Sequence, residues 1–205
     1  MKHLNTINDH SSTEERIIEA ARKLFTQNGF SGTRTRDIAS ESGINLALLN
    51  YYFRSKEKLF EKIMAEKLQE LFGTIIPILN DTETSFEKKI ELFVETYIDN
   101  ISKNPDIPIF VLREIQKNPE KFKQRAPFKG ILLKSVFIAQ LKERKPELNP
   151  MHFFLNLMGM TVFPFIARPM IIATGSITEK EFLSLVSERK KYIPIWINAM
   201  LEKKL

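Results

Sequence analysis

The chain has 205 residues, of which 43% are hydrophobic and 27% are charged, an ordinary balance for a soluble globular protein of one large or two small domains. It contains no cysteine, which excludes disulfides, thiolate zinc sites, iron–sulfur clusters and cysteine nucleophiles. The net charge of +6 suits a nucleic-acid partner, although residues 117–145 alone, with nine Lys/Arg and two Glu (9 − 2 = +7), exceed it, so the excess charge does not lie at the N-terminus. We interpret this basic stretch as a solvated face, with an anion-binding or partner surface as the alternative.

Apolar residues recur at helical spacing along the whole chain, and no segment alternates with the period of a strand. The sequence therefore predicts an all-α fold of about nine helices. The glycines at 29 and 43 and the proline at 77 punctuate the N-terminal part. The predicted N-terminal helices and their caps are a helix from Ser12 with a Ser12/Glu15 capping box, Arg34–Glu41 after Thr33, Leu46–Tyr52 after Asn45, and a helix from Ser55 to Ile76.

The remaining segments predict six further helices, two of which are short. Capping boxes at Thr84/Glu87 and Thr178/Glu181 open two of them, and Asn149-Pro150 opens the most apolar one. The predicted spans are residues 84–102, 107–117, 119–125, 128–144, 149–174 and 178 to the C-terminus. A domain boundary is expected near residue 55, with residues 1–55 as the first domain and 56–205 as the second.

The most apolar stretch of the chain runs from Met151 to Thr174. A span needs roughly 20 apolar residues with few interruptions. His152, Pro164 and Arg168 interrupt this one. We therefore favour a buried interface helix over a membrane helix.

Three short helices with a glycine turn between the second and third are typical of a helix-turn-helix DNA-binding domain. On a helical wheel of residues 45–53, Leu49 and Phe53 face inward toward Ile38 and the first helix. Ala47, Leu48 and Tyr51 fall on the opposite side, flanked by Asn50 and Tyr52. A major groove accounts for that outer face, because apolar groups contact thymine methyls, Asn pairs with adenine and Tyr hydroxyls reach phosphates.

The run GFSGTRTRDIASESGINLALLNYYFRSKEKLF resembles the N-terminal domain of the TetR family of transcriptional regulators. The resemblance covers about residues 13–60. The matching residues are Gly29-Phe30, Thr33, Asp37-Ile38-Ala39, Gly43-Ile44, Leu49, Tyr51, Phe53, Ser55-Lys56 and Leu59. Asn50 and Tyr52 depart from the Tyr and His common in the family, so the operator sequence is not readable by analogy.

The resemblance implies a role in DNA binding for eight residues of this domain. Thr33, Tyr51, Tyr52 and Lys56 would hold phosphates, and Asn45, Leu46, Ala47 and Leu48 would lie near base edges. The wheel adds Asn50, whose amide can pair with adenine. The alternative is purely structural: Tyr51, Tyr52 and Leu46 would pack the small domain, and Lys56 would be a solvated lysine.

A homodimer is expected, because so small a recognition module reads a palindromic operator in pairs. Apolar stripes on the last two helices are the predicted interface, as a four-helix bundle, and the alternative is that both stripes are intramolecular core. The predicted interface residues are Phe154, Met158, Phe165, Phe182, Leu185, Val186, Arg189, Ile193, Trp196 and Met200.

The family resemblance also implies a small-molecule effector bound among the middle helices. Residues that mix apolar bulk with sparse polar groups are the candidates, although core packing is the alternative for each apolar one. They are Phe93, Tyr97, Phe110, Arg113, Phe137, His152, Asn156 and Met160. For Arg113 we favour a salt bridge with Glu95 or Glu114 over an anionic ligand.

The sequence therefore predicts a cytoplasmic, ligand-responsive DNA-binding regulator, most simply a repressor that a small molecule releases from its operator. The chain carries none of the common catalytic motifs, so neither an enzyme, a cofactor nor a bound metal is expected. The alternatives are a protein of the same fold with an activating or non-transcriptional role, and a helical membrane or interaction protein.

Overall fold

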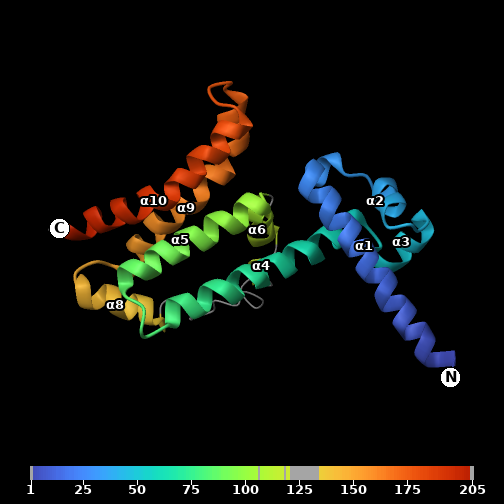
Figure 1. Ribbon diagram of the computed structural model, residues 1–205, viewed down its shortest axis with the longest axis horizontal. Coiled ribbons are helices and arrows are strands. Elements are labelled where there is room, and N and C mark those ends of the chain that lie inside the picture. Colours follow the sequence, from blue (N-terminus) through green and yellow to red (C-terminus); the bar gives the residue numbers. More distant parts are fainter. Residues whose placement is uncertain (1, 106, 118, 121–133, 204–205) are drawn as a thin grey trace. The chain divides into compact units, whose positions relative to one another are not determined.

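The computed structural model describes residues 2–105, 107–117, 119–120 and 134–203, without the side chains of residues 2–12, 110, 113–115 and 117. All nine regular elements in these residues are α-helices, which confirms the predicted fold class (Figure 1). The chain forms two compact units, residues 1–68 and 69–205. The first unit thus extends 13 residues beyond the boundary expected at residue 55, because the start of the fourth helix packs with the first.

The first unit is a small bundle around one apolar core. Its helices are α1 (Lys2–Gly32), α2 (Thr35–Glu41), α3 (Leu46–Phe53) and the first half of α4 (Lys56–Asn80). Ile17, Phe25, Ile38, Leu49 and Leu59 are buried to within 2%. Phe25, Phe30 and Phe60 add a ring cluster with centroid separations of 4.9 to 6.1 Å. Every helix of the unit contributes to this core, so α3 has a fixed inner face.

Helix α1 differs from the prediction at its start and agrees with it near its end. It begins at Lys2 rather than at Ser12, because neither glycine nor proline precedes Ser12 to stop the helix. Gly29, with φ 66° and ψ 175°, interrupts α1 as expected. The chain then turns toward α2 through a conformation that a residue with a side chain rarely adopts.

In its described residues, the second unit contains the end of α4 and five further helices. They are α5 (Phe86–Lys103), α6 (Ile107–Lys117), α8 (Val136–Arg144), α9 (Pro150–Ala173) and α10 (Glu179–Glu202). Helix α5 packs against α8, α9 and α10, and α9 and α10 lie side by side (Figure 1). The core is rich in phenylalanine, with Phe137 in ring contact with both Phe86 and Phe153.

Three predicted helix boundaries in this unit are wrong for local reasons. Helix α4 continues past Pro77 to Asn80. Ser85 rather than Thr84 caps α5, because its side chain accepts from Lys88 N while the Thr84 hydroxyl donates to Asp81. Helix α8 starts at Val136 behind the cap Ser135 rather than at residue 128. Residues 121–133, with most of the helix predicted at 119–125, lie outside the described residues.

Helix α9 is long and apolar enough to cross a membrane by length and composition alone. One stripe of it, including Phe153, Leu157 and Phe165, packs into the core of the second unit. Only 22% of its most apolar window is buried within the chain. Much of the apolar surface of α9 therefore remains exposed.

Candidate nucleic-acid interface

Helix α3 is held in one orientation by its cap and its buried face. Asn45 caps it, with Oδ1 accepting from Leu48 N at 2.8 Å. Leu49 and Phe53, one turn apart, are 0% and 7% exposed, and Ile38 of α2 is fully buried. The wheel therefore gave the inner face of α3 correctly, and its opposite face is presented outward.

The outward face of α3 combines apolar, amide and phenol groups. Asn45, Ala47, Asn50 and Tyr51 are exposed, Tyr51 to 74%. Leu46, Leu48 and Tyr52 are partly buried. Tyr52 meets the Tyr51 ring edge-on, with centroids 5.5 Å apart. The Tyr51 ring and hydroxyl are thus the most exposed aromatic group of this face.

The turn between α2 and α3 is braced from α1. Gly43 has φ 67°, and a Cβ there would lie 2.9 Å from Arg16 Nη2. Arg16 Nη2 donates to the Ser42 carbonyl at 2.6 Å, and the buried Ser42 hydroxyl donates to Ile38 O at 2.7 Å. Glycine at this position thus gives both the left-handed turn and room for the arginine, which fixes α3 relative to α2.

Thr33 does not lie where a phosphate contact requires it. Its side chain is 1% exposed, and its hydroxyl donates to the carbonyls of Leu24 and Gly29 at 3.1 and 2.8 Å. It does not cap α2 either, because Arg34 occupies the N-cap position. The sequence prediction for the Thr33 hydroxyl is therefore corrected: it ties the kink at Gly29 to α1.

Lys56, at the start of α4, already has partners within the unit. Its Nζ donates to the carbonyls of Phe30 and Thr33, each at 2.9 Å, and lies 4.2 Å from the centroid of the Phe30 ring. An ammonium group has three donors, so one N–H remains for an external acceptor. Lys56 is thus neither the plain solvated lysine nor a dedicated phosphate ligand.

Three exposed cations beside the helix-turn-helix were missed by the sequence reasoning. Arg34 and Arg36 lie at the start of α2, and Arg54 directly follows α3. Arg54 has φ 56°, an uncommon backbone conformation for a residue with a side chain. The available signal was their position at helix starts and ends, where a duplex backbone contacts a helix-turn-helix.

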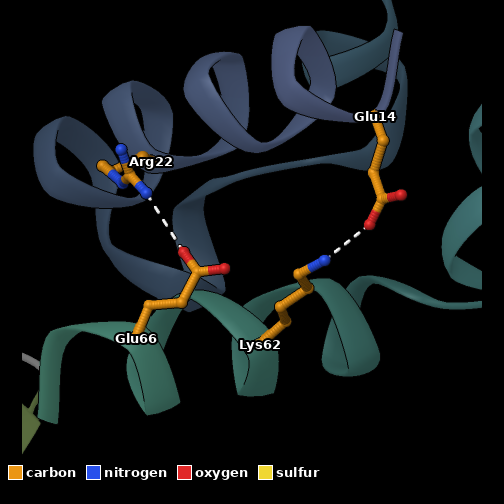
Figure 2. A network of polar contacts seen from close by, with 4 residues as sticks. All are labelled: Glu14, Arg22, Lys62 and Glu66. Carbon is orange, nitrogen blue, oxygen red and sulfur yellow. Dashed lines mark hydrogen bonds and ion pairs between the residues drawn. The ribbon is translucent and has the colours of Figure 1, made fainter. Parts of the chain in front are cut away.

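Two ion pairs join α1 to the first half of α4 (Figure 2). Lys62 Nζ lies 2.5 Å from a Glu14 carboxylate oxygen, and Arg22 Nη2 lies 3.1 Å from Glu66. The side chains are about 40% exposed, so the pairs contribute little to stability. Lying two turns apart on α1, they define the register between the two helices.

The predicted effector residues do not converge on one place. Phe93, Tyr97 and Phe137 are buried in the core of the second unit, whereas His152 and Asn156 are exposed on α9 and Met160 is half-buried. Asn156 donates to Met200 Sδ at 3.2 Å. His152 and Asn156 therefore lie on the surface of α9, away from the buried members of the set, and their assignment to an effector site stays a prediction. The side chains of Phe110 and Arg113 lie outside the described residues.

The predicted dimer residues divide in the same way. Phe165, Phe182, Val186 and Ile193 are at most 3% exposed and belong to the core of the chain itself, which corrects the prediction for these four. Phe154, Met158 and Met200 are partly buried. Leu185 and Trp196 are exposed, to 42% and 44%. The residues predicted on α10 thus combine three from its inner face, Phe182, Val186 and Ile193, with exposed Leu185 and Trp196.

The exposed apolar side chains of α9 and α10 form a second stripe beside the predicted one. It comprises Met151, Leu155, Phe163 and Met170 on α9 and Leu185, Tyr192, Ile195 and Trp196 on α10, each at least 42% exposed. The Tyr192 and Trp196 rings stack with centroids 5.7 Å apart. We call these exposed apolar residues of the two helices the α9/α10 face.

Arg189 of α10 contacts both the backbone of α9 and the exposed Trp196 ring. Its Nε and Nη2 donate to the Met160 carbonyl at 3.1 and 2.7 Å, and its guanidinium lies 5.2 Å from the centroid of the Trp196 ring. Pro164 has no N–H with which to bond that carbonyl within α9, so Arg189 supplies the missing donor. Partial burial lowers the pKa of Arg189. Arg189 therefore stabilises the packing of α9 against α10 besides lying at the α9/α10 face.

Comparison with known proteins agrees with this geometry. Residues 17–63 match the model of bacterial regulatory proteins of the tetR family. The chain is 29% identical over 170 residues, 79% of its length and 81% of the relative's, to a probable HTH-type transcriptional regulator, YttP, of Bacillus subtilis. It is 30% identical over 93 residues, 45% of each chain, to the HTH-type transcriptional repressor KstR2 of Mycolicibacterium smegmatis.

Solved structures share the fold over nearly the whole chain. A transcriptional regulator of the TetR/AcrR family from Thermobifida fusca superposes with a TM-score of 0.62 at 18% identity, over 86% of this chain and 95% of that one. The fatty acid degradation regulator FadR of Bacillus halodurans gives 0.54 at 16% identity, over 87% and 92%. With these likenesses in fold, the match over residues 17–63 identifies the N-terminal helix-turn-helix as one similar to that of the tetR family of bacterial regulatory proteins.

Proposed function

We propose that this protein is a transcription regulator that binds a palindromic operator as a homodimer and is released from it by a small molecule. The observation that carries the proposal is the outward face of α3: an apolar, amide and phenol surface on a capped helix whose turn is braced by Arg16. The relatives named as repressors support repression as its output.

Each group on that face has a chemical counterpart in a DNA major groove. Ala47 and Leu48 offer methyl groups to thymine, and the Asn50 amide pairs with the two hydrogen-bonding atoms of an adenine edge. The exposed Tyr51 hydroxyl and the third N–H of Lys56 reach phosphates. Arg34 and Arg54 add charge at the two sides of the motif, where the sugar-phosphate backbone passes.

Selection of bound sequences from random DNA duplexes by the full chain tests this function. A dimer with one recognition helix per copy selects a palindrome whose half-sites lie one helical turn, or a multiple, apart. Binding with no sequence preference, or a single asymmetric half-site, would contradict the proposal.

The homodimer is proposed to form through the α9/α10 face. Its apolar residues are the ones that an identical copy would bury, and a self-complementary patch of this kind is the usual basis of a two-fold dimer. Such a regulator acts at the chromosome, in the cytoplasm.

The effector is proposed to act through α4, which is continuous from the first unit into the second. A ligand that binds better to the DNA-incompetent state shifts the population toward that state, and the coupling is reciprocal. We expect an effector to weaken operator binding by about 1–3 kcal/mol without dissociating the dimer.

Titration of a candidate effector with and without saturating operator duplex tests this switch. Operator should lower effector affinity by the same factor by which effector lowers operator affinity. Equal effector affinities in the two titrations exclude the switch for that compound, and effector-driven monomer formation refutes the mechanism.

A further inference from the structure

A strained turn at Arg54 joins α3 to α4. Within the described part of the chain, Arg54 is the only residue other than glycine with a positive φ, of 56° with ψ −37°. Ser55 N donates to the Phe53 carbonyl at 2.5 Å, which closes a three-residue turn close to the classic γ type. This conformation is strained for a residue with a side chain, whereas glycine adopts positive φ readily. The chain thus places an arginine where the backbone alone favours glycine.

Contacts on both sides hold the turn in this conformation. On the α3 side, Arg54 N donates to the Asn50 carbonyl at 2.9 Å, and Phe53 is buried in the core of the first unit. On the α4 side, the Lys56 ammonium group is bound to two carbonyls, and Leu59 is fully buried. Backbone strain persists only where the surrounding structure determines the conformation, and here the ends of both helices do so.

The side chain of Arg54 gains nothing within the described chain that would offset the strain. It is exposed, and its guanidinium forms no hydrogen bond, ion pair or ring contact with another described residue. By contrast, Arg16 and Arg22 of the same unit are bonded to the Ser42 carbonyl and to Glu66. All five N–H donors of Arg54 are therefore available to a group outside the chain.

A DNA phosphate is the group that suits this position. Tyr51, three residues before Arg54, is 74% exposed on the face of α3 that is proposed to enter the major groove, and phosphates border that groove. A guanidinium pairs its N–H groups with two oxygens of one phosphate, in bonds roughly twice as strong as those between neutral groups. Lys56, two residues later, has one N–H left for the same backbone.

We propose that the strained turn at Arg54 positions its guanidinium for a DNA phosphate beside the outward face of α3, in the free chain as in the complex. The phosphate contact then offsets a strain for which the chain itself has no compensation. This inference rests on the proposed function, for which it names a positioning turn. Its consequence is that stability and DNA affinity change in opposite directions when glycine replaces Arg54.

Three variants separate the backbone from the side chain. Arg54→Ala and Arg54→Gly both remove the guanidinium, but only glycine relieves the strain, whereas Arg54→Lys keeps the strain and a cation. Arg36 is exposed and lies within α2, so Arg36→Ala and Arg36→Gly are the matched controls at a helical φ.

Two measurements are made on each variant. Stability is followed by urea unfolding with circular dichroism. DNA binding is followed by fluorescence anisotropy at four salt concentrations, with the duplex that the wild type selects from random DNA and with a duplex of scrambled sequence. The scrambled duplex is included because a phosphate contact carries no sequence information.

We expect Arg54→Gly to lower the unfolding equilibrium constant about fivefold relative to both the wild type and Arg54→Ala, because the strain is lost. Both variants should bind either duplex about tenfold more weakly than the wild type, with the slope of log K against log salt reduced by about 0.9. Arg54→Lys should keep the wild-type slope and stability. At Arg36 the order of stability should be reversed, since glycine disfavours a helix interior.

Three results would overturn the inference. Equal stability of Arg54→Gly and Arg54→Ala would show that the turn is not strained. Wild-type affinity and slope in both variants would exclude the phosphate contact. Different affinities of the two variants would show that the turn changes on binding. Because the Arg54 effect is also read on the scrambled duplex, a wild type that binds DNA without sequence preference would overturn the proposed function and still leave this inference testable.

Discussion

The exposed faces of α3 and α10 carry similar apolar groups, but the outward face of α3 lies where the sequence predicted it, whereas the residues predicted on α10 divide between the core and the surface. Helix α3 is short and capped, and only one of its sides packs against the rest of the unit. Leu49 and Phe53 therefore mark its inner side unambiguously. Helix α10 has apolar residues on two sides. A stripe at helical spacing shows that a helix is amphipathic but does not show which of two apolar stripes is internal.

Local sequence signals and tertiary packing partners determine different features of a helix. Helix caps, turn glycines and a proline at the first helical position act within a few residues. The N-caps at Asn45, Asn149 and Thr178 lie where the sequence predicted them. Burial of Phe182 or exposure of Trp196 depends on which distant helix packs on α10. Four experiments test this difference between local and tertiary control.

The largest effect is expected from placing a charge on each side of α10. Phe182 is 0% exposed in the core, so Phe182→Glu buries an unpaired carboxylate and should unfold the second unit, at a cost of more than about 4 kcal/mol. Trp196→Glu should leave the helices folded and shift the protein to monomers. Circular dichroism with sedimentation measures both, and a folded dimer after Trp196→Glu would move the interface elsewhere.

The next effect concerns the second-unit core at high pH. Burial raises the pKa of Tyr97 to about 12 from its ordinary 10.0, because the charged phenolate is disfavoured there. The contribution of the buried, neutral Tyr97 phenol to the free energy of unfolding is complete below pH 10. It is lost as pH rises from 10 to 12, since Tyr97 loses its proton in the unfolded chain before it does so in the folded one. This loss amounts to about 2–3 kcal/mol at most.

Urea unfolding of the wild type and of Tyr97→Phe between pH 9 and 12 isolates that contribution. The free energy of unfolding of the wild type should fall relative to that of Tyr97→Phe as pH rises. A constant difference across this range would show that the Tyr97 hydroxyl is not buried as described.

A smaller effect should separate bracing from DNA contact in the first unit. Lys56→Ala removes two hydrogen bonds to Phe30 and Thr33 carbonyls as well as a cation, so it should lower both the melting temperature and operator affinity. Arg54→Ala, at an exposed site, should weaken operator binding without lowering the melting temperature. Each should reduce the slope of log K against log salt by about 0.9 if the side chain neutralises one phosphate.

Fluorescence anisotropy at four salt concentrations and a thermal melt suffice for both variants. An unchanged slope for Lys56→Ala would leave Lys56 with the bracing role alone. The phosphate contact would then have to come from Arg34, Arg36 or Arg54.

The smallest effect is a coupling within the α9/α10 pair. Arg189→Met leaves the Met160 carbonyl without a donor, whereas Pro164→Ala restores the donor within α9. The double variant should therefore be less destabilised than the sum of the two single changes, by about 1 kcal/mol. Strict additivity in this double-mutant cycle would mean that Arg189 does not compensate for the proline.

Most of the fold and about half of the candidate site could be predicted from the sequence. The outer face of α3 follows from periodicity and the Asn45 cap, and the family resemblance follows from ordered positions between Gly29 and Leu59. The burial of Thr33 could not be predicted, because it depends on the kink that brings Leu24 and Gly29 carbonyls to its hydroxyl. The bonds of Lys56 and Arg189 also join segments far apart in the sequence.

The effector residues were the least predictable part. Phenylalanines suit a core and a ligand cavity equally, and the structure places Phe137 in contact with Phe86 and Phe153. Only the packing of α5, α8 and α9 distinguishes the two uses, and periodicity does not report it.

The central claim, that the outward face of α3 reads DNA, is tested most directly by comparing the operator motifs that wild type and Asn50→Ala select from the same random duplexes. Asn50 is exposed on α3, so the account predicts a variant that stays folded and dimeric but loses its preference at one base pair. That base pair should lie at the same position in each half-site, with a loss of about 1–3 kcal/mol of discrimination. An unchanged motif, or a change confined to one half-site, would contradict it.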